Sequence, residues 1–166
     1  MKFFLIVLLS LLTYSDAFGW SGIVEQVQSG TTLLVRPIGG NPAKVVRLYG
    51  VDTPTLRQPY GLQAKEYLEK LTPIGNKVNI DSTLTDSNGI EVALLQVESV
   101  SVNYKMLEAG WAWVKREECQ GLFCRRWYIQ ERYAIRDRRG VWNSKYKTPP
   151  WQWGRQSINM KSSENN

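Results

Sequence analysis

The sequence predicts an α+β domain that is mainly β, a small five-stranded barrel of OB type with three helices. Two observations support this prediction. Five segments rich in β-branched and aromatic residues are separated by clusters of turn residues. Three further segments repeat their apolar residues at the spacing of a helix. With 166 residues and no internal repeat or linker, the chain has room for one domain with a full core.

The first three predicted strands follow one another through tight turns. Residues 20–27 alternate between apolar and polar side chains, and residues 28–31 form a turn. The chain returns over residues 32–37, turns again at the Gly-Gly-Asn-Pro of residues 39–42, and continues as a strand over residues 43–49. Three consecutive strands joined by turns predict a β-meander.

Helices and strands alternate in the middle of the chain. Residues 61–71 are predicted to be helical, and strands are predicted over residues 77–81 and 90–97 on either side of a turn at residues 86–89. A second helix is predicted over residues 100–109. The apolar side of the first helix consists of Leu62, Tyr67, Leu68 and Leu71.

The last part of the predicted domain contains a helix and an aromatic segment. A short strand at residues 111–114 precedes a third helix over residues 125–138. Residues 149–153 are expected to be extended. We interpret Trp151 and Trp153 of this segment as a cover on the domain surface rather than as ligand contacts.

The N-terminus has the pattern of a secretory signal peptide. Lys2 precedes an apolar run over residues 3–14, and small residues follow as far as Ala17. The run is short for a membrane span, and a retained signal anchor is the alternative. We expect cleavage near Ala17 and a secreted or periplasmic mature protein. The predicted organisation is a signal peptide over residues 1–17, a domain over residues 18–156 and a disordered polar tail over residues 157–166.

The chain is basic, with 21 Lys and Arg against 15 Asp and Glu and a formal net charge of +6. Loss of the signal peptide removes one charge of each sign, so the mature charge is unchanged. This charge favours a polyanionic partner such as nucleic acid, anionic lipid or a cell-wall polymer. The absence of histidine excludes Ser-His and Cys-His nucleophile pairs. Cys119 and Cys124 cannot form an ordinary zinc site alone and are predicted to pair as a disulfide that closes a short loop.

Residues 45–54 carry the most specific chemistry in the sequence. A predicted strand contains Arg47, and Gly50 permits a sharp departure toward Asp52 and Thr53. A guanidinium can grip two phosphate oxygens, and a carboxylate is a ligand for Ca²⁺ or Mg²⁺. The segment therefore predicts a pocket for phosphate and metal, with a surface ion pair at a strand end as the alternative.

Several segments, in the same order, resemble the staphylococcal nuclease (thermonuclease) family. The Val-Arg-Leu-Tyr-Gly-Val-Asp-Thr-Pro of residues 46–54 is similar to the family segment that carries an arginine and metal ligands. The further matches are Pro-Tyr-Gly-Leu-Gln-Ala at residues 59–64, Ser-Val-Asn at residues 101–103, Leu-Glu-Ala-Gly-Trp-Ala at residues 107–112, Ala134, and Arg-Gly-Val-Trp at residues 139–142. The resemblance implies a five-stranded OB-like barrel with three helices.

The resemblance also implies a Ca²⁺-dependent phosphodiesterase that cuts DNA and RNA. The family's site needs carboxylates for the metal, a glutamate to activate or orient water, and two arginines on the phosphate. Arg47 corresponds to the first arginine, Asp52 to a metal carboxylate and Thr53 to its neighbouring ligand. Ca²⁺ is expected only if the protein is active, and no other cofactor is expected.

The sequence departs from the family at the other site positions. Thr31 replaces a metal aspartate, Thr55 replaces the glutamate and Ile90 replaces the second arginine. A positioned acid or base contributes roughly 10²–10⁴ in rate, and one donor on the developing charge contributes roughly 10²–10³. These replacements predict an impaired enzyme, a pseudoenzyme of the family. The nearby residues that could compensate are Arg57, Glu25 and Glu91.

The third predicted helix carries a row of arginines that could bind nucleic acid. A row of guanidiniums can follow a phosphate backbone with little sequence preference, and a solvated basic helix face is the alternative. The row consists of Arg125, Arg132, Arg136 and Arg139, flanked by Arg126 and Arg138. The aromatic residues that could stack on bases are Tyr60, Trp113, Trp127 and Tyr128, although a barrel this small is expected to place most aromatics in its core.

Three functional hypotheses follow. The first is a secreted, catalytically impaired protein that acts as a nucleic-acid or anionic-polymer binding module. The second is an active Ca²⁺-dependent endonuclease with a rearranged site. The third is a scaffold or interaction protein of a secretion or envelope assembly, which would have a protein partner. Binding to a nucleic-acid backbone weakens steeply with salt, whereas an apolar protein contact does not, so a salt titration separates the first hypothesis from the third.

Overall fold

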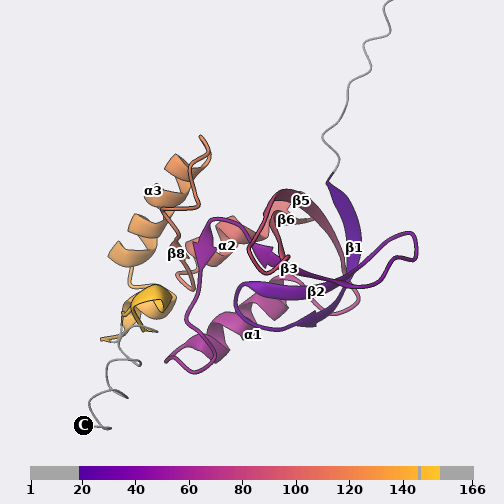
Figure 1. The fold of residues 1–166 in the computed structure, drawn as a ribbon. Helices are drawn as coiled ribbons and strands as arrows, with labels where there is room; N and C mark the ends of the chain where they lie inside the picture. The colour runs from indigo at the N-terminus through magenta and orange to yellow at the C-terminus, as the bar shows by residue number, and fades with distance from the viewer. Residues whose placement is uncertain (1–18, 146, 154–166) are drawn as a thin grey trace, which may run out of the picture.

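The computed structural model describes residues 19–145 and 147–153 of the chain (Figure 1). The predicted signal peptide with its cleavage near Ala17, and the predicted polar tail over residues 157–166, lie outside the described residues. Within the described part of the chain, no helix is long and apolar enough to cross a membrane.

The strands close into a barrel. The strands of the described residues are β1 (Trp20–Val27), β2 (Thr32–Pro37), β3 (Lys44–Leu48), β4 (Val51–Asp52), β5 (Lys77–Thr85), β6 (Glu91–Val97), β7 (Val100–Ser101) and β8 (Trp113–Val114). Five of them follow the order β3-β2-β1-β5-β6 with antiparallel neighbours. A parallel pairing of β3 with β6 closes the barrel, and β4 pairs with β8 outside it. The five-stranded barrel confirms the predicted fold class.

The helices complete the predicted α+β architecture. They are α1 (Gly61–Leu71), α2 (Val102–Glu108) and α3 (Cys124–Arg136), followed by a 3₁₀ turn, η1 (Gly140–Asn143). α1 and α2 contact strands of the barrel, whereas α3 packs on α2 and on β8. Figure 1 shows α3 at the edge of the molecule, on the side of α2 away from the barrel. One side of α3 is therefore left uncovered by the barrel.

Several elements differ from the sequence prediction, among them β5, α2, α3 and the segment at residues 150–153. β5 continues to Thr85 because its pairing with β6 extends past a bulge. α2 begins at Val102 because Ser101 is its N-cap, and the Ser101 hydroxyl accepts the Tyr104 N–H. α3 ends at Arg136, so residues 137–138 are not helical. Residues 150–153 form a helical turn instead of an extended segment, because the Gln152 and Trp153 N–H groups both donate to the Pro149 carbonyl.

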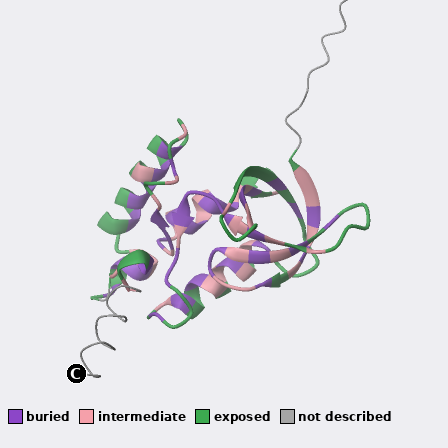
Figure 2. Cartoon of the chain, viewed as in Figure 1, coloured by how far each residue is buried: buried purple, intermediate pink, exposed green. Residues whose placement is uncertain are grey.

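The core fills the barrel and the space between the barrel and the helices (Figure 2). Met106 and Leu107 of α2 are buried, and Trp127 of α3 joins the same cluster. The strand residues of this core include Val24, Leu33, Val35, Val46, Leu48, Val78, Ile80, Val92 and Leu95. Trp113 and Trp142 form a second, smaller cluster with their rings 5.1 Å apart.

The prediction for α1 was wrong at Leu62. Its side chain is exposed, and the buried positions of α1 are Gly61, Ala64 and Leu68. These three positions are separated by three and four residues and form one stripe on the helix, from which Leu62 is rotated by about a third of a turn. Gly61 is required at this contact, because a Cβ there would collide with the Thr55 carbonyl.

The predicted disulfide is present between Cys119 and Cys124. Both sulfur-bearing side chains are buried, and the bond closes the loop that leads from β8 into α3. Cys119 also contacts the chain near Gly50, where an added Cβ would lie 3.1 Å from the Cys119 sulfur. The bond therefore fixes this loop beside the segment that carries Asp52 and Thr53.

Reduction of the disulfide is expected to lower the free energy of unfolding by about 2 kcal/mol, because the closed loop is short. Urea denaturation of the protein with and without a reducing agent measures this difference. A Cys119→Ser/Cys124→Ser variant, unaffected by the reducing agent, is the control. Equal denaturation midpoints for the oxidised and reduced wild-type protein would contradict the expectation.

Candidate active site and nucleic-acid interface

The turn before β2 and the end of β3 bring four of the predicted site residues together. Arg47 lies opposite Thr32 in the β2–β3 ladder, and the Leu48 N–H donates to the Thr31 carbonyl at 2.8 Å. A Cβ at Gly30 would collide with the Thr53 hydroxyl, so this turn packs directly against Thr53. Asp52 precedes Thr53 and is close enough to Arg47 for their charges to interact. Thr31, Arg47, Asp52 and Thr53 therefore lie close together, and their roles in a phosphate and metal site stay a prediction.

The guanidinium of Arg47 is occupied by a carboxylate from another part of the chain. Arg47 Nη1 donates to Glu118 Oε2 at 3.2 Å, and Nη2 donates to Glu118 Oε1 at 3.1 Å. The two side chains are 20% and 7% exposed. Lys115 Nζ lies 3.0 Å from the same carboxylate. A two-pronged contact of this kind is the one that an arginine would otherwise offer to a phosphate.

The backbone around Glu118 is fixed from three directions. The Tyr49 hydroxyl donates to the Glu118 carbonyl, and the Glu118 N–H donates to the Lys115 carbonyl at 3.0 Å. The next residue, Cys119, is held by the disulfide, and its carbonyl accepts the Tyr128 hydroxyl at 2.9 Å. Glu118 is therefore placed beside Arg47 by a rigid loop.

Asp52 is a partly buried carboxylate with positively charged side chains nearby. Its Oδ1 accepts the Thr53 N–H at 3.0 Å, and it lines a cavity of about 280 Å³ with Lys115, Arg116 and Trp151. Partial burial raises the pKa of Asp52, although the Thr53 hydrogen bond and the nearby positive charges of Lys115 and Arg47 oppose the rise. The charged form of Asp52 is thus disfavoured relative to a carboxylate in water.

The donors at this site do not fit a Ca²⁺ ion. Such an ion takes six to eight oxygen ligands and depends on negative charge. Asp52 is the one carboxylate at this site that forms no ion pair with a lysine or arginine, because Glu118 pairs with Arg47 and Lys115. Thr31 and Thr53 offer only neutral oxygens. The described residues contain no group of three or more acidic, histidine or cysteine side chains that could hold a metal.

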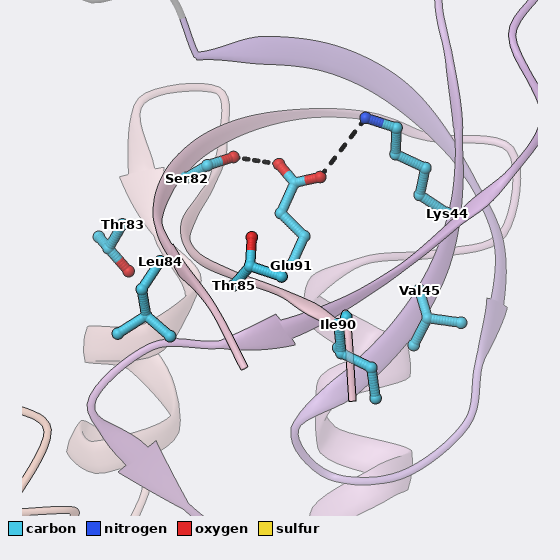
Figure 3. Close-up of a pocket in the computed structure, with 9 residues that line it drawn as sticks. Lys44, Val45, Ser82, Thr83, Leu84, Thr85, Ile90 and Glu91 are labelled. Carbon is cyan, nitrogen blue, oxygen red and sulfur yellow. Dashed lines mark hydrogen bonds and ion pairs between the residues drawn. The ribbon is translucent and has the colours of Figure 1, made fainter. Parts of the chain in front are cut away.

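The two other family positions, Thr55 and Ile90, lie on the loop before α1 and next to the β3–β6 pairing. Thr55 is exposed on the loop before α1, and its N–H donates to Gln58 Oε1 at 3.3 Å. Ile90 follows the turn at residues 86–89 and lines a separate open cavity of about 630 Å³ with Lys44 and Glu91 (Figure 3). Neither side chain supplies a charge.

The three residues that could compensate have other placements. Glu91 accepts Trp20 Nε1 at 2.5 Å. It also accepts the Ser82 hydroxyl and pairs with Lys44 Nζ at 3.6 Å (Figure 3). Glu25 pairs with Arg36 at 2.5 Å. Arg57 is exposed on the loop between β4 and α1. The carboxylate that does lie beside Arg47, Glu118, was not identified from the sequence, since 71 residues separate the two and no motif links them.

The arginines of α3 divide into two groups. Arg125, Arg126 and Arg132 are exposed, and no carboxylate of the described residues pairs with them. Arg136 and Arg139 both pair with Asp137 at 2.6 Å. The prediction that Arg139 lies on the helix face was wrong, because α3 ends at Arg136 and Arg139 Nη1 donates to the Glu108 carbonyl at the end of α2.

The aromatic residues considered for base stacking are largely structural. Trp113 and Trp127 are buried in the two core clusters. Tyr60 packs against Trp111, with ring centroids 6.4 Å apart. Tyr128 is half-buried, donates its hydroxyl to the Cys119 carbonyl and lies under the guanidinium of Arg116. These four rings therefore do not form a platform for stacking on bases.

Comparisons with known proteins agree with the barrel fold. The family model described as staphylococcal nuclease homologue matches residues 45–144. A probable staphylococcal-like nuclease of Oryza sativa subsp. japonica is 32% identical over 69% of this chain and 33% of its own length, so the chain spans about a third of that relative. A micrococcal nuclease of Shigella flexneri is 25% identical over 93% of this chain and 90% of its own. Protein ParB of Escherichia coli is 27% identical over 84% and 82%. The chain belongs to the staphylococcal nuclease family.

Proposed function

We propose that this protein binds nucleic acid through α3 and has lost most of the hydrolytic capacity of its family. The single observation that carries the proposal is the pairing of Arg47 with Glu118, which occupies the phosphate-binding arginine with an internal carboxylate. The signal peptide predicted over residues 1–17 extends the proposal to a mature protein that acts in the periplasm or outside the cell.

Loss of hydrolysis is supported by the chemistry of the site. Phosphodiester cleavage needs a water held for in-line attack and positive charge on the phosphate as the leaving oxygen departs. Thr55 has no carboxylate for the water, and Ile90 has no charge for the phosphate. The guanidinium of Arg47 is neutralised by Glu118, which also holds Lys115. Each of these losses falls on a different part of the reaction, so restoring one does not compensate for the others.

Binding through α3 is supported by exposure and charge. Arg125 and Arg132 are two turns apart on the same side of the helix and carry no ion pair within the described residues. The only carboxylate in the sequence of α3, Glu131, is buried on the opposite side. It accepts the Val114 N–H at 2.8 Å and pairs with Arg116 at 3.0 Å. The outward side of the helix therefore presents uncompensated positive charge to a phosphate backbone.

The test is a salt titration of DNA binding by fluorescence anisotropy. Arg125→Ala/Arg132→Ala is expected to weaken binding about tenfold at low salt and to reduce the slope of log K against log salt by roughly two, because two phosphate contacts are lost. Lys70→Ala/Lys77→Ala removes the same charge from exposed positions on other elements and is the matched control. If the two double variants behave alike, only net charge matters and α3 is not the contact.

A further inference from the structure

The outward side of α3 is apolar as well as basic. Ile129 and Tyr133 are 49% and 46% exposed, and Leu122, just before the helix, is 87% exposed. We infer that these side chains, together with Arg125 and Arg132, form a binding surface for an anionic lipid bilayer. This surface, the outer face of α3, consists of Leu122, Arg125, Ile129, Arg132, Tyr133 and Arg136. The inference goes beyond the proposed binding of nucleic acid.

The helical repeat gathers the outer face on one side. Residues 125, 129, 132, 133 and 136 are separated by three and four positions or adjoin one another, so their side chains lie together. Ile129, Arg132, Tyr133 and Arg136 border one hollow of about 520 Å³. The buried side of α3, which includes Cys124, Trp127, Glu131 and Ala134, faces the domain. Figure 2 shows exposed residues along the side of α3 that is turned away from the barrel.

The loop before the helix presents Leu122 in a fixed position. The disulfide joins Cys119 to Cys124 across this loop, and the Cys124 N–H donates to the Gly121 carbonyl at 3.0 Å. Leu122 borders a second hollow that it shares with Arg116 and Arg125. Leu122 is exposed to solvent on a loop that the disulfide restrains. Its backbone therefore loses little conformational freedom when the side chain enters an apolar phase. Leu122 is therefore suited to insert at the boundary between lipid headgroups and acyl chains.

The two aliphatic residues of the outer face, Leu122 and Ile129, are suited to lipid and not to nucleic acid. Leucine and isoleucine have no planar ring for base stacking and make no contact with a phosphate, so a nucleic-acid site gains nothing from Leu122 or Ile129. At a bilayer surface both the aliphatic side chains and the arginines have suitable partners. Apolar groups enter the acyl boundary, while arginines extend their charged ends to the phosphates of anionic headgroups.

The charges around the outer face fit the same ligand. Glu131 is turned inward, and Asp137 at the end of the helix is paired with Arg136 and Arg139. Tyr133 lies under the guanidinium of Arg136, 4.9 Å from its ring centroid. A tyrosine with a polar end and an apolar ring is a residue typical of the membrane interface. No carboxylate of α3 would therefore oppose a negatively charged membrane.

The test measures vesicle binding by cosedimentation, with phosphatidylcholine vesicles that contain or lack phosphatidylglycerol. The wild-type mature domain is expected to bind the phosphatidylglycerol vesicles and not the neutral ones. Leu122→Ser/Ile129→Ser is expected to lower this binding at least about tenfold while its affinity for DNA stays unchanged. The control is Ile38→Ser/Leu62→Ser, which removes two exposed aliphatic side chains from other parts of the domain, 57% and 56% exposed. Circular dichroism and thermal melting confirm that both variants are folded.

Each outcome decides the inference. Loss of vesicle binding in the α3 variant alone supports it, whether or not the wild-type protein binds DNA, so failure of the proposed function is seen separately. Absence of binding to phosphatidylglycerol vesicles overturns it. The inference is also overturned if Leu122→Ser/Ile129→Ser binds the vesicles as well as the wild-type protein does, because the contact is then purely electrostatic. Equal losses of DNA and vesicle binding would assign Leu122 and Ile129 to a general polyanion contact and overturn it as well.

Discussion

Arg47→Ala is expected to lower the free energy of unfolding by about 2–3 kcal/mol, because it leaves the carboxylate of Glu118 nearly buried without its main partner. The expectation is below that for a fully buried pair, since Arg47 is partly exposed and Lys115 still contacts Glu118. If the Arg47 side chain instead lay in an open site with no internal partner, its removal would lower the free energy of unfolding only slightly. Urea denaturation at neutral pH therefore measures whether Arg47 now has a structural role.

The comparison with Glu118→Gln separates the ion pair from simple loss of packing. Glutamine has nearly the same volume and still accepts a hydrogen bond from Arg47, but it carries no charge. In the Arg47→Ala/Glu118→Gln double variant, part of the lost stability is expected to return, because no unpaired charge is left behind. The double-mutant cycle should give a coupling of about 1–2 kcal/mol. Additive effects of the two substitutions would show that the pair is not coupled, contrary to the geometry.

The fold could be predicted because local signals and tertiary packing agree. The strand at residues 20–27 alternates in the sequence, and Val24 and Val27 of β1 are buried as a half-covered strand requires. The boundaries that differed depend on contacts absent from the local sequence. The predicted strand ended at residue 81. β5 continues to Thr85 because the Thr83 hydroxyl donates to the Val92 carbonyl and the two residues after Thr83 pair with β6.

The site could be predicted only in part. Arg47, Asp52 and Thr53 lie within one short segment, so their sequence proximity ensures that they are neighbours in the structure. Glu118 comes from the loop after β8, and its position depends on the β4–β8 pairing and on the disulfide. The row of arginines on α3 was predicted from helical spacing, but the position of Arg139 depended on where the helix ends. Such endpoints are set by packing with η1 and α2.

The protein is expected to show no cleavage of single-stranded DNA at a rate typical of its family in millimolar Ca²⁺. The reason is that the water-orienting carboxylate and the second phosphate charge are absent at Thr55 and Ile90, while Arg47 is held by Glu118. Release of labelled fragments over time is the measurement, with Asp52→Ala as the control. The two proteins are expected to give the same background. Cleavage by the wild-type protein that disappears in Asp52→Ala would refute the proposed loss of hydrolysis.

Restoring the family's side chains tests the same argument in the opposite direction. Thr31→Asp, Thr55→Glu and Ile90→Arg return the missing charges, and adding Glu118→Gln releases Arg47. The four changes together are expected to raise Ca²⁺-dependent cleavage by roughly 10² or more over the wild-type background. The three changes with Glu118 retained should give a smaller rise, because a phosphate must still displace a carboxylate from Arg47. Equal rates in the two backgrounds would mean that Glu118 leaves Arg47 accessible to phosphate, and the loss of activity would then rest on Thr31, Thr55 and Ile90 alone.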